Sequence, residues 1–398
     1  MHPADEIRYT KSKKLFKKRI ILAVTGSIAA VETIKLAREL IRHGAEVYPV
    51  MSPSSTKIIH PDSLWFATGN KPIVELTGAT EHVSFCGKVE KPVDLLLICP
   101  STANTISKIA HGIDDTSVTT FATTALGSNI PILLVPAMHI SMYEHKIVQK
   151  NIEKCKKIGI RFIEPSLEEN IAKMVENDEI ISYVIREIGK KDLLKKKILI
   201  IGGPTAEKID DVRIITNLSS GKTAICLAKD AFFRDADVEL WYGPGMEPTP
   251  NYIKKINFES IYDIEKLLKK RSLKDFDSII LCAAISDYIP KKHKGKIQSK
   301  KEKFFLEMTP APKIISYLRK KAPQSKIIGF KVEEKKDTLE KKAMILLNKN
   351  NLNFAIANLI YGFNKNENEI WIFDKKGKII HKKGNKEELA DFILDIIK

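Results

Sequence analysis

The sequence has few cysteines and lacks any apolar run long enough to cross a membrane. Its 398 residues include five scattered cysteines and no CxxC pair, which argues against a disulfide framework and against a thiolate zinc site. No apolar stretch approaches the roughly 18 to 20 residues that a membrane span needs. The basic start, MHPADEIRYTKSKKLFKKR, has no apolar signal segment. We therefore expect a cytoplasmic protein without a membrane partner, in which residues 1–19 form a short solvated tail.

The sequence also lacks the pattern of a nucleic-acid-binding protein, although its net charge is +17. The lysines are spread along the chain and mixed with glutamates, and no basic segment is interleaved with aromatic residues. A basic, solvated surface also suits phosphorylated small molecules. We expect small-molecule substrates and no nucleic acid.

The chain is too long for one ordinary core, and its pattern predicts two α/β domains. A length of 398 residues favours two domains of about 200 residues each. Continuous apolar runs alternate with amphipathic segments, which is typical of a parallel sheet covered by helices on both faces. The expected strands are 21–25, 45–51, 93–99, 130–136, 198–203, 238–243, 278–284, 326–330 and 353–358. The lysine-rich stretch 189–197 separates two doubly wound, Rossmann- or flavodoxin-like domains, 20–189 and 190–398.

Small and polar residues follow the strands of the first domain, at the edge where doubly wound sheets bind ligands. The first strand is followed by VTGSIAA, the second by MSPSST and the third by PSTANT. A glycine turn at a helix start lets backbone N–H groups approach a phosphate, but the dinucleotide fingerprint GxGxxG is absent. The hydroxyls of Ser101 and Thr102 could equally cap a helix. The three strand ends together favour a ligand site.

The segment PAMHISMY (136–143) directly follows the fourth expected strand. Two thioethers and an imidazole could form a copper-type metal site, and the same residues could line the pocket of an organic cofactor. The motifs VTGSIAA, PSTANT and PAMHISMY, in this order and spacing, resemble the flavin mononucleotide (FMN)-dependent cysteine decarboxylase family over residues 20–185. This resemblance favours the pocket, with the methionines and the tyrosine beside the flavin.

The resemblance implies that the first domain binds FMN and decarboxylates 4'-phosphopantothenoylcysteine to 4'-phosphopantetheine. In that chemistry oxidised flavin accepts two electrons from the cysteine side chain, the thioaldehyde lets carbon dioxide leave, and reduced flavin returns the electrons. His82, in TEHVSF, matches the family's catalytic histidine, and His139 would bind the substrate carboxylate. The implied FMN-binding residues are Gly26, Ser27, Ile28, Ser52, Ser101, Thr102, Asn104, Thr105, Ala137 and Met138.

The sequence departs from the family pattern at two places. His139 stands where the family has an asparagine, and the segment FIEPSLEENIAKM lacks the family's cysteine, which is thought to supply a proton in the last half-reaction. His139, Lys173 and bound water are candidates for that proton donor. The two departures are linked if His139 both binds the carboxylate and donates the proton.

The second domain carries a long motif, GGPTAEKIDDVRIITNLSSGK (202–222), directly after its first expected strand. It is not a P-loop, because Thr216 rather than a glycine stands five residues before Gly221. With the downstream segments CAAISDY, KGKIQSK and APKII, it resembles the phosphopantothenate–cysteine ligase family over residues 197–397.

This second resemblance implies that the domain joins cysteine to 4'-phosphopantothenate through an acyl-nucleotide. The carboxylate attacks the α-phosphate of a nucleoside triphosphate, expected to be CTP rather than ATP, pyrophosphate leaves, and the cysteine amine displaces the nucleotide. Asn217 and Lys296 are the implied catalytic residues, and Asp287 the implied ligand of Mg²⁺ or Mn²⁺. The implied nucleotide-binding residues are Ser219, Ser220, Gly221, Lys222, Cys282, Ala283, Asp287, Lys296, Pro312, Lys313, Ile314, Ile315 and Phe330.

Two features of this nucleotide site stay open. The family's two further nucleotide-contacting lysines align with Leu346 and Asn350, where Lys342 or Lys349 could substitute. The lysine-rich segment 290–303 is expected to close over the nucleotide as a lid, although an ordinary solvated loop has the same composition.

Together the two resemblances imply a bifunctional enzyme of coenzyme A biosynthesis, whose ligase product feeds its decarboxylase domain. Related decarboxylase domains form trimers and ligase domains form dimers, which implies a homo-oligomer as large as a dodecamer. An electron-transfer flavoprotein fused to a nucleotide-binding module is an alternative, and the charge alone suggests a nucleic-acid-binding protein. The visible spectrum and a test for nucleotide-dependent amide formation distinguish the three.

Overall fold

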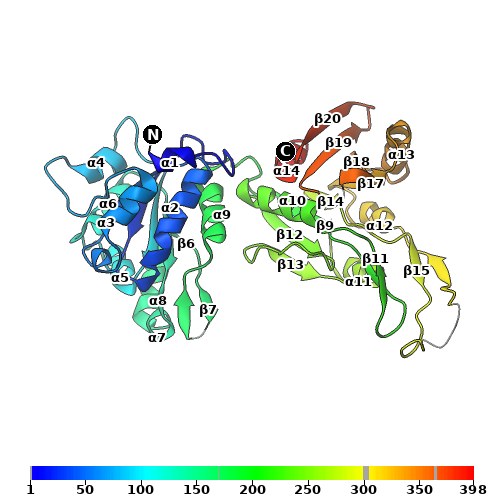
Figure 1. The fold of residues 1–398 in the computed structure, drawn as a ribbon, viewed down its shortest axis with the longest axis horizontal. Coiled ribbons are helices and arrows are strands. Elements are labelled where there is room, and N and C mark those ends of the chain that lie inside the picture. The colour runs from blue at the N-terminus through cyan, green and yellow to red at the C-terminus, as the bar shows by residue number, and fades with distance from the viewer. Residues whose placement is uncertain (1, 169, 299–303, 363–364) are drawn as a thin grey trace. The chain divides into compact units, whose positions relative to one another are not determined.

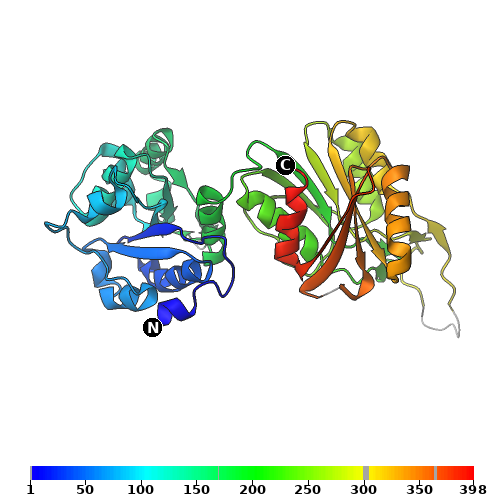
Figure 2. The same ribbon diagram turned by 90° about the horizontal axis from the view of Figure 1, so that it is seen from above.

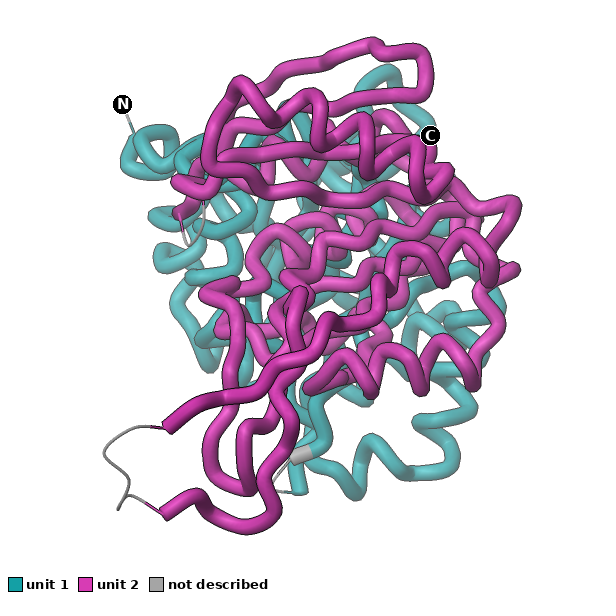
Figure 3. The backbone as a smooth tube through the Cα atoms, turned by 90° about the vertical axis from the view of Figure 1, so that its right-hand side faces the viewer, with its two compact units in different colours: residues 1–189 teal, residues 190–398 magenta. Residues whose placement is uncertain are grey.

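The computed structural model describes residues 2–168, 170–298, 304–362 and 365–398. The chain divides between Gly189 and Lys190 into two compact units, shown in separate colours in Figure 3. Each unit is built around its own sheet with helices on both faces (Figure 1). The predicted fold class, two doubly wound α/β domains, is confirmed.

Unit 1 contains a five-stranded parallel sheet between two layers of helices. Its strands are β1 (Arg19–Val24), β2 (Glu46–Met51), β3 (Leu95–Ser101), β4 (Ile132–Pro136) and β6 (Arg161–Phe162). Its helices are α1 (Pro3–Glu6), η1 (Ile28–Glu32), α2 (Thr33–Arg42), η2 (Ser55–Lys57), α3 (Pro61–Thr68), α4 (Glu81–Cys86), α5 (Ala103–His111), α6 (Ser117–Gly127), α7 (Ile140–Tyr143), α8 (Lys146–Lys157) and α9 (Asn177–Ile188). The strand order is β2-β1-β3-β4-β6. Residues of α5, α6 and α8 form one core cluster with the strands, and β3 is buried along its whole length, as expected of a central strand covered on both faces.

A small three-stranded antiparallel sheet follows the main sheet of unit 1. It consists of β5 (Met138–His139), β8 (Ile171–Lys173) and β7 (Ser166–Glu168), in that order. Met138 pairs with Ala172, and His139 with Ile171. This pairing places the segment after Ser166 beside the PAMHISMY segment.

Residues 2–18 are packed onto unit 1, so the prediction of a solvated tail is wrong. Leu15 is fully buried and Ala4 is 1% exposed. Arg8 Nη1 donates a hydrogen bond to the carbonyl of Ala45 at 2.7 Å, and Leu15 N donates to the carbonyl of His43 at 2.9 Å. Because Ala4 and Leu15 lie in short charged segments without a helical or alternating apolar pattern, no periodicity indicates their burial.

Unit 2 contains an eight-stranded sheet whose last two strands run antiparallel to their neighbours. Its strands are β9 (Lys197–Gly202), β12 (Asp237–Tyr242), β13 (Lys254–Asn257), β14 (Ser278–Leu281), β17 (Lys326–Glu333), β18 (Phe354–Leu359), β19 (Glu367–Asp374) and β20 (Ile379–Asn385). Its helices are α10 (Lys222–Phe233), α11 (Ile261–Lys270), α12 (Ile314–Lys321), α13 (Lys336–Lys349), η3 (Ile360–Gly362) and α14 (Lys386–Asp395). The strand order is β13-β12-β9-β14-β17-β18-β19-β20. Figure 2 shows α10 and α14 on one face of this sheet and α13 on the other.

Two short hairpins extend from the main sheet of unit 2 (Figure 1). The first pairs β10 (Ala206–Lys208) with β11 (Ile214–Thr216), and the second pairs β15 (Tyr288–Pro290) with β16 (Met308–Pro310). Asn217 directly follows the first hairpin and Asp287 directly precedes the second. The hairpins therefore fix where these two predicted site residues stand.

The sequence analysis located most of the parallel strands of the two main sheets but none of the antiparallel strands. Each of the nine expected strands overlaps an observed strand, whereas the parallel strands β6 and β13, the antiparallel strands β5, β7, β8, β19 and β20 and both hairpins were not predicted. Within the described residues no helix has the length and apolar character that crossing a membrane requires.

Candidate active sites

In unit 1 the loops after β1 and β3 are tied together at the carboxyl edge of the sheet. Thr25 Oγ1 donates to the carbonyl of Pro100 at 2.8 Å and accepts from Thr102 N at 3.1 Å. Ser27 precedes η1, and its side chain makes no capping hydrogen bond. The turn of Gly26 and Ser27 therefore lies beside the start of α5, with the Ser27 hydroxyl not used by the cap.

In the PSTANT segment the threonine hydroxyls take part in the cap of α5, whereas the hydroxyl of Ser101 makes no hydrogen bond within the described residues. Thr102 Oγ1 caps α5 by accepting from Thr105 N at 3.3 Å, and the two threonine hydroxyls lie 3.1 Å apart. Ser101 Oγ is buried without a hydrogen-bond partner among the described residues, although its carbonyl accepts from Ala137 N at 3.1 Å. Asn104 is exposed in the first turn of α5. Because a buried hydroxyl without a partner is unfavourable, Ser101 is the residue of this segment best suited to bind a ligand.

Gly26 and Ser52 have local roles that the fold itself explains. A Cβ at Gly26 would lie 2.5 Å from Ser54 Cβ, so a glycine lets the two loops approach each other. Ser52 is buried, and its hydroxyl accepts from Ser55 N at 3.3 Å, which closes the turn after β2. Both residues shape the carboxyl edge of the sheet.

A cavity of about 730 Å³ opens at this edge, lined by residues 27–29, 31–32, 137–139 and 171–177. Among the residues predicted from the sequence, the lining includes Ser27, Ile28, Ala137, Met138 and His139. The predicted residues that stand near this edge without lining the cavity are Gly26, Ser52, Ser101, Thr102, Asn104 and Thr105. The structure therefore brings the β1 turn and the PAMHISMY segment together around one space.

Three further residues complete this cavity. Lys173, a candidate proton donor, lines it together with Glu32 and Asn177, which the motifs did not indicate. Asn177 Oδ1 is buried without a partner among the described residues. The cavity therefore has apolar walls and the unpaired oxygen of Asn177, and the unpaired hydroxyl of Ser101 lies next to its wall residue Ala137. Such a cavity fits an aromatic ligand with polar edges. A flavin has this chemistry, so the residues present fit the cofactor that the sequence predicted.

The imidazole ring of His139 is held by hydrogen bonds with Ser141, two residues further along the chain. It precedes α7, and its Nδ1 accepts from Ser141 N at 3.3 Å and lies 2.8 Å from Ser141 Oγ. A ring nitrogen that accepts from a backbone N–H carries no proton, so we assign the proton of neutral His139 to Nε2. The imidazole then presents an N–H donor, as the amide of an asparagine would.

The rest of the PAMHISMY segment differs from the expected cofactor wall. Tyr143 Oη donates to Glu164 Oε2 at 2.6 Å, and burial together with this carboxylate raises the pKa of Tyr143. Met142 is 48% exposed, and neither it nor Tyr143 lines the cavity, whereas Met138 does. Across the part of the chain that the structure describes, no group of three or more His, Cys, Asp or Glu side chains could hold a metal ion.

His82 lies on α4, which packs against α6, and it does not line the cavity. Its Nδ1 is buried without a hydrogen-bond partner among the described residues. An unpaired ring nitrogen is able to accept a hydrogen bond from a ligand or from another chain. The structure of unit 1 by itself therefore does not bring the two predicted catalytic histidines to one cavity.

In unit 2 two adjoining cavities lie at the carboxyl ends of the central strands. The larger, of about 990 Å³, is lined by residues 216–218, 281, 283–287, 312–316, 330–332, 342, 345–346, 349–350 and 360. Asn217 lines it, and its Nδ2 donates to the carbonyl of Ala284 at 2.8 Å, which fixes the amide. The predicted nucleotide-binding residues that share this lining are Ala283, Asp287, Pro312, Lys313, Ile314, Ile315 and Phe330.

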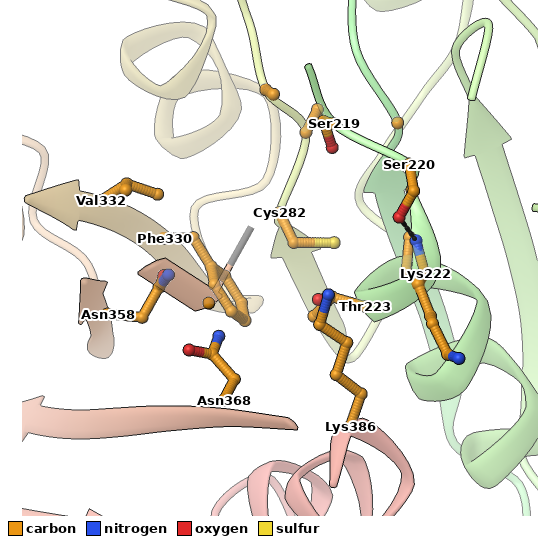
Figure 4. Close-up of a pocket in the computed structure, with 16 residues that line it drawn as sticks. Ser219, Ser220, Lys222, Thr223, Cys282, Phe330, Val332, Asn358, Asn368 and Lys386 are labelled. Atoms are coloured by element: carbon orange, nitrogen blue, oxygen red, sulfur yellow. Dashed lines mark hydrogen bonds between the residues drawn. The ribbon is translucent and has the colours of Figure 1, made fainter. Parts of the chain in front are cut away.

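The smaller cavity, of about 100 Å³, lies at the start of α10 (Figure 4). Its lining contains the predicted residues Ser219, Ser220, Gly221, Lys222 and Cys282. It shares Ala283, Ala284, Phe330 and Val332 with the larger cavity, and no Asp or Glu of the described chain lines it. Burial raises the pKa of the Cys282 thiol to about 12, so this thiol stays uncharged.

Gly221 gives the start of α10 its shape. Its φ is +82°, and a Cβ there would lie 2.1 Å from Tyr242 Oη. In the first turn, Lys222 N donates to Ser220 Oγ at 3.3 Å, and Ala224 N and Ile225 N donate to the carbonyl of Gly221 at 3.0 and 3.3 Å. The N–H of Thr223 has no partner within the described residues, so it is open to an anion. The Nζ of Lys222 donates to Asn366 Oδ1 at 2.5 Å, and Figure 4 shows this side chain directed away from the centre of the pocket.

Asp287 forms an ion pair with Lys313, with 2.5 Å between Oδ1 and Nζ, and both side chains are exposed. Protein sites for Mg²⁺ usually combine one or two carboxylates with the phosphates of the substrate. Asp287 alone therefore suits a divalent ion that arrives with a nucleotide.

Lys296 lies outside both cavities, on the segment that follows β15. The buried carboxylate of Asp210 accepts from Ile297 N at 3.1 Å and from the N and Nη1 of Arg213, both at 2.6 Å. Burial opposes ionisation of Asp210, but these donors hold its pKa well below its usual range. Asp210 thereby anchors the start of the predicted lid, of which residues 299–303 lie outside the described residues.

Two residues that the motifs missed and two lysines that the sequence analysis named as substitutes also line the cavities of unit 2. Lys386 and Asn368 line the smaller cavity. Lys342 and Lys349 line the larger one together with Leu346. The family's two lysines align with Leu346 and Asn350, so Lys342 and Lys349 place lysines on the same cavity. The asparagine cap and acidic first turn of NKEEL indicate the start of α14, but nothing in the sequence indicates which helix α14 covers.

Comparison with known proteins agrees with this geometry. The Flavoprotein family model matches residues 8–189, and the model of the DNA/pantothenate metabolism flavoprotein C-terminal domain matches residues 193–398. The fold and the sites therefore define a flavoprotein domain joined to a pantothenate-metabolism domain.

Full-length relatives make this assignment more specific. The chain is 43% identical over 402 residues to the coenzyme A biosynthesis bifunctional protein CoaBC of Thermococcus kodakarensis, covering 100% of this chain and 99% of the relative. It is 42% identical over 408 residues to the protein of the same description from Methanocaldococcus jannaschii, covering 100% and 98%. A solved structure, the DNA/pantothenate metabolism flavoprotein from Streptococcus pneumoniae, is 26% identical, covers 51% of this chain and 98% of that chain, and has a TM-score of 0.46. The chain belongs to the family of coenzyme A biosynthesis bifunctional proteins, and it is an enzyme with decarboxylase and ligase activities.

Proposed function

We propose that unit 2 joins cysteine to 4'-phosphopantothenate with CTP and Mg²⁺, and that unit 1 decarboxylates the product with FMN. The observation that carries this proposal is the pair of adjoining cavities in unit 2, which share Ala283 and Phe330. Asn217 lines the larger cavity, and the start of α10 lines the smaller one. A carboxylate is a poor acyl donor, so it must first be activated, and this site offers separate places for a carboxylate and for phosphates.

In the ligase reaction a carboxylate oxygen of 4'-phosphopantothenate attacks the α-phosphorus of CTP, and pyrophosphate leaves. The bond from Asn217 Nδ2 to the carbonyl of Ala284 orients the amide, and its second N–H holds the acyl oxygen of the intermediate. The cysteine amine then attacks the acyl carbon and CMP leaves. Lys296, carried on the segment anchored by Asp210, offsets charge on the phosphates when the segment closes.

The divalent ion is assigned to Asp287, which exchanges its ion pair with Lys313 for the metal that CTP brings. Lys313 is then free to contact a phosphate. Lys342 and Lys349, which line the larger cavity, supply the lysines that the family has at the positions of Leu346 and Asn350 and contact the nucleotide.

When bound, a flavin would supply the reversible two-electron oxidation of the substrate that the decarboxylation requires. Ser101 and Asn177, whose side-chain oxygens lack partners within the described residues, would hold the flavin. His139 donates from Nε2 to the substrate carboxylate, and Lys173 on the same cavity supplies a positive charge. His82 acts as base or orients the thiol.

We further propose that the protein is cytoplasmic and forms a homo-oligomer in which unit 1 is trimeric. The cavity of unit 1 is bordered by Ile28 and Val31, which are 77% and 44% exposed. Apolar side chains at the mouth of a cofactor site are favourably covered by a second copy of the chain. A second copy could also bring His82 to the flavin, which unit 1 by itself does not.

The test supplies 4'-phosphopantothenate, cysteine and Mg²⁺ with either CTP or ATP to the purified holoenzyme, and follows 4'-phosphopantetheine by mass spectrometry. Product formed with CTP at a higher kcat/KM than with ATP is the expected result. Absence of product with both nucleotides contradicts the proposal. The visible spectrum of the same sample should show bound oxidised flavin, and a released cofactor with the mass of FMN.

A further inference from the structure

The smaller cavity of unit 2 contains a cation that no sequence motif indicated. Lys386 is the first residue of α14, and 7% of it is exposed. Figure 4 shows its side chain extending from α14 into the pocket, toward the start of α10. Within the described residues its ammonium forms no hydrogen bond and no ion pair.

An ammonium in this position is unfavourable while the cavity holds no anion. Burial is the main effect that lowers the pKa of Lys386, and the charge of Lys222 adds to it, whereas Cys226 and Glu247 act in the opposite direction. Buried charges in proteins are paired or bind ions. Because no carboxylate of the described chain lines the cavity, the positive charge of Lys386 has no counter-charge inside it.

The cavity around Lys386 is suited to phosphate. The N–H of Thr223, in the first turn of α10, has no partner within the described residues. The hydroxyls of Ser219, Ser220 and Thr223 line the same space. The Nζ of Lys222 is occupied by Asn366 Oδ1 at 2.5 Å, so Lys386 is the lysine that reaches the centre of the pocket.

The position of the smaller cavity beside the larger one indicates which phosphates of a nucleoside triphosphate it can bind. It shares the wall of Ala283 and Phe330 with the larger cavity, which contains Asn217. In the proposed ligase reaction the acyl–nucleotide bond forms beside Asn217. A triphosphate with its α-phosphate at this wall extends its β- and γ-phosphates into the smaller cavity.

We infer that Lys386 binds the β- and γ-phosphates of the nucleoside triphosphate, the part that leaves as pyrophosphate, together with the N–H of Thr223. The inference rests on the ligase function proposed above. When the carboxylate oxygen bonds to the α-phosphorus, the bond to the bridging oxygen breaks and that oxygen takes the electron pair. Lys386 offsets the negative charge that develops on this leaving group.

The test compares Lys386→Met with Lys383→Met in the full-length holoenzyme. Lys383 is an exposed lysine of β20 outside both cavities, so the control removes the same charge from a nearby position. Affinities for CTP and for CMP are measured at one Mg²⁺ concentration, because CMP lacks the two phosphates that Lys386 is inferred to bind. Should ATP support ligation better, ATP and AMP replace them.

Lys386→Met should weaken CTP binding by about ten- to hundredfold, the range expected for a lost charge-assisted contact, and CMP binding by less than about twofold. Lys383→Met should change neither affinity. Unbound Lys386→Met should melt no lower than the wild type, because the substitution removes an unpaired buried charge, and Lys386→Arg should restore part of the CTP affinity. An equal loss for CTP and CMP, or no loss for CTP, overturns the inference, whereas failure of the wild type to form the amide overturns the proposed function instead.

Discussion

The two units use their predicted polar residues differently. In unit 1 most of the predicted hydroxyls satisfy the local backbone: Thr102 and Thr105 belong to the cap of α5, and Ser52 closes a turn. In unit 2 most of the predicted nucleotide residues line the two cavities, and the amide of Asn217 is held by the carbonyl of Ala284.

The difference shows what a short motif and a long motif can specify. A serine or threonine after a strand has a ready backbone partner one turn away, so its presence alone does not separate capping from binding. The long motif of unit 2 includes residues such as Gly221, which the close approach of Tyr242 requires, and Asp210, which anchors a distant segment. In unit 1 the informative groups are those left without a partner among the described residues, Ser101 and His82.

The largest expected effect separates the two units by activity. Asn217→Asp or Lys296→Gln should lower amide formation by at least about a hundredfold, as loss of a group that stabilises transition-state charge does, and should leave decarboxylation of supplied 4'-phosphopantothenoylcysteine intact. His82→Asn should do the reverse. Both rates are measured by mass spectrometry on the same preparations, and a variant that loses both activities would break the assignment of one reaction to each unit.

A smaller effect is expected at Asp210, which acts through the segment that carries Lys296. Asp210→Asn keeps the size of the side chain but exchanges one carboxylate oxygen for an amide, so ligation kcat/KM should fall about tenfold, the effect of one weakened charge-assisted contact. Asp211→Asn, at an exposed carboxylate paired with Lys292, should have a weaker effect. Equal losses in the two variants would show that burial of Asp210 is irrelevant to the position of Lys296.

The low pKa of Asp210 adds a pH dependence to this prediction. Because the folded-state pKa lies below the unfolded value of about 3.9, the carboxylate contributes stability above that pH, and the contribution is lost as pH falls through the folded value. Acid unfolding curves of the wild type and Asp210→Asn should therefore differ most near neutrality and converge toward low pH. A constant difference down to the lowest pH would contradict the sign of this shift.

Neighbouring hydroxyls in unit 1 should separate binding from capping. Ser101→Ala should raise the dissociation constant of the flavin about fivefold, within the range of one neutral hydrogen bond, without lowering the melting temperature. Thr102→Ala should leave flavin affinity nearly unchanged but destabilise unit 1 by about 1 kcal/mol through loss of the cap. Flavin titration and thermal unfolding test the pair, and the opposite pattern would assign the ligand to Thr102.

The smallest effect is expected for His139→Asn. Asparagine caps a helix as well as the Nδ1 of His139 does, and it offers an N–H donor to the substrate carboxylate. Decarboxylation kcat should therefore change by less than about threefold, within a fraction of one hydrogen bond. A much larger loss, with an altered pH profile and normal substrate affinity, would show that His139 also transfers the proton whose family donor is missing.

The sequence predicts the central strands and most of the ligase site because those features are local in the chain. Continuous apolar runs mark β3 and β9, and the glycine at position 221 marks the start of α10. The packing of Leu15 and the place of Lys386 could not be predicted in this way. Each depends on a contact with a distant segment, and a single apolar residue or lysine in a charged stretch carries no periodic signal.

The docking of residues 2–18 onto unit 1 also bears on how the chain is made. Arg8 and Leu15 contact Ala45 and His43, so this segment is held by residues synthesised only about thirty positions later, and unit 1 is continuous in sequence. Domains that are continuous and contain early local contacts can fold while the ribosome is still translating the next one. Unit 1 can accordingly be complete before the first strand of unit 2 emerges, and a shortened chain that began at β1 would emerge with the surface beneath Leu15 uncovered.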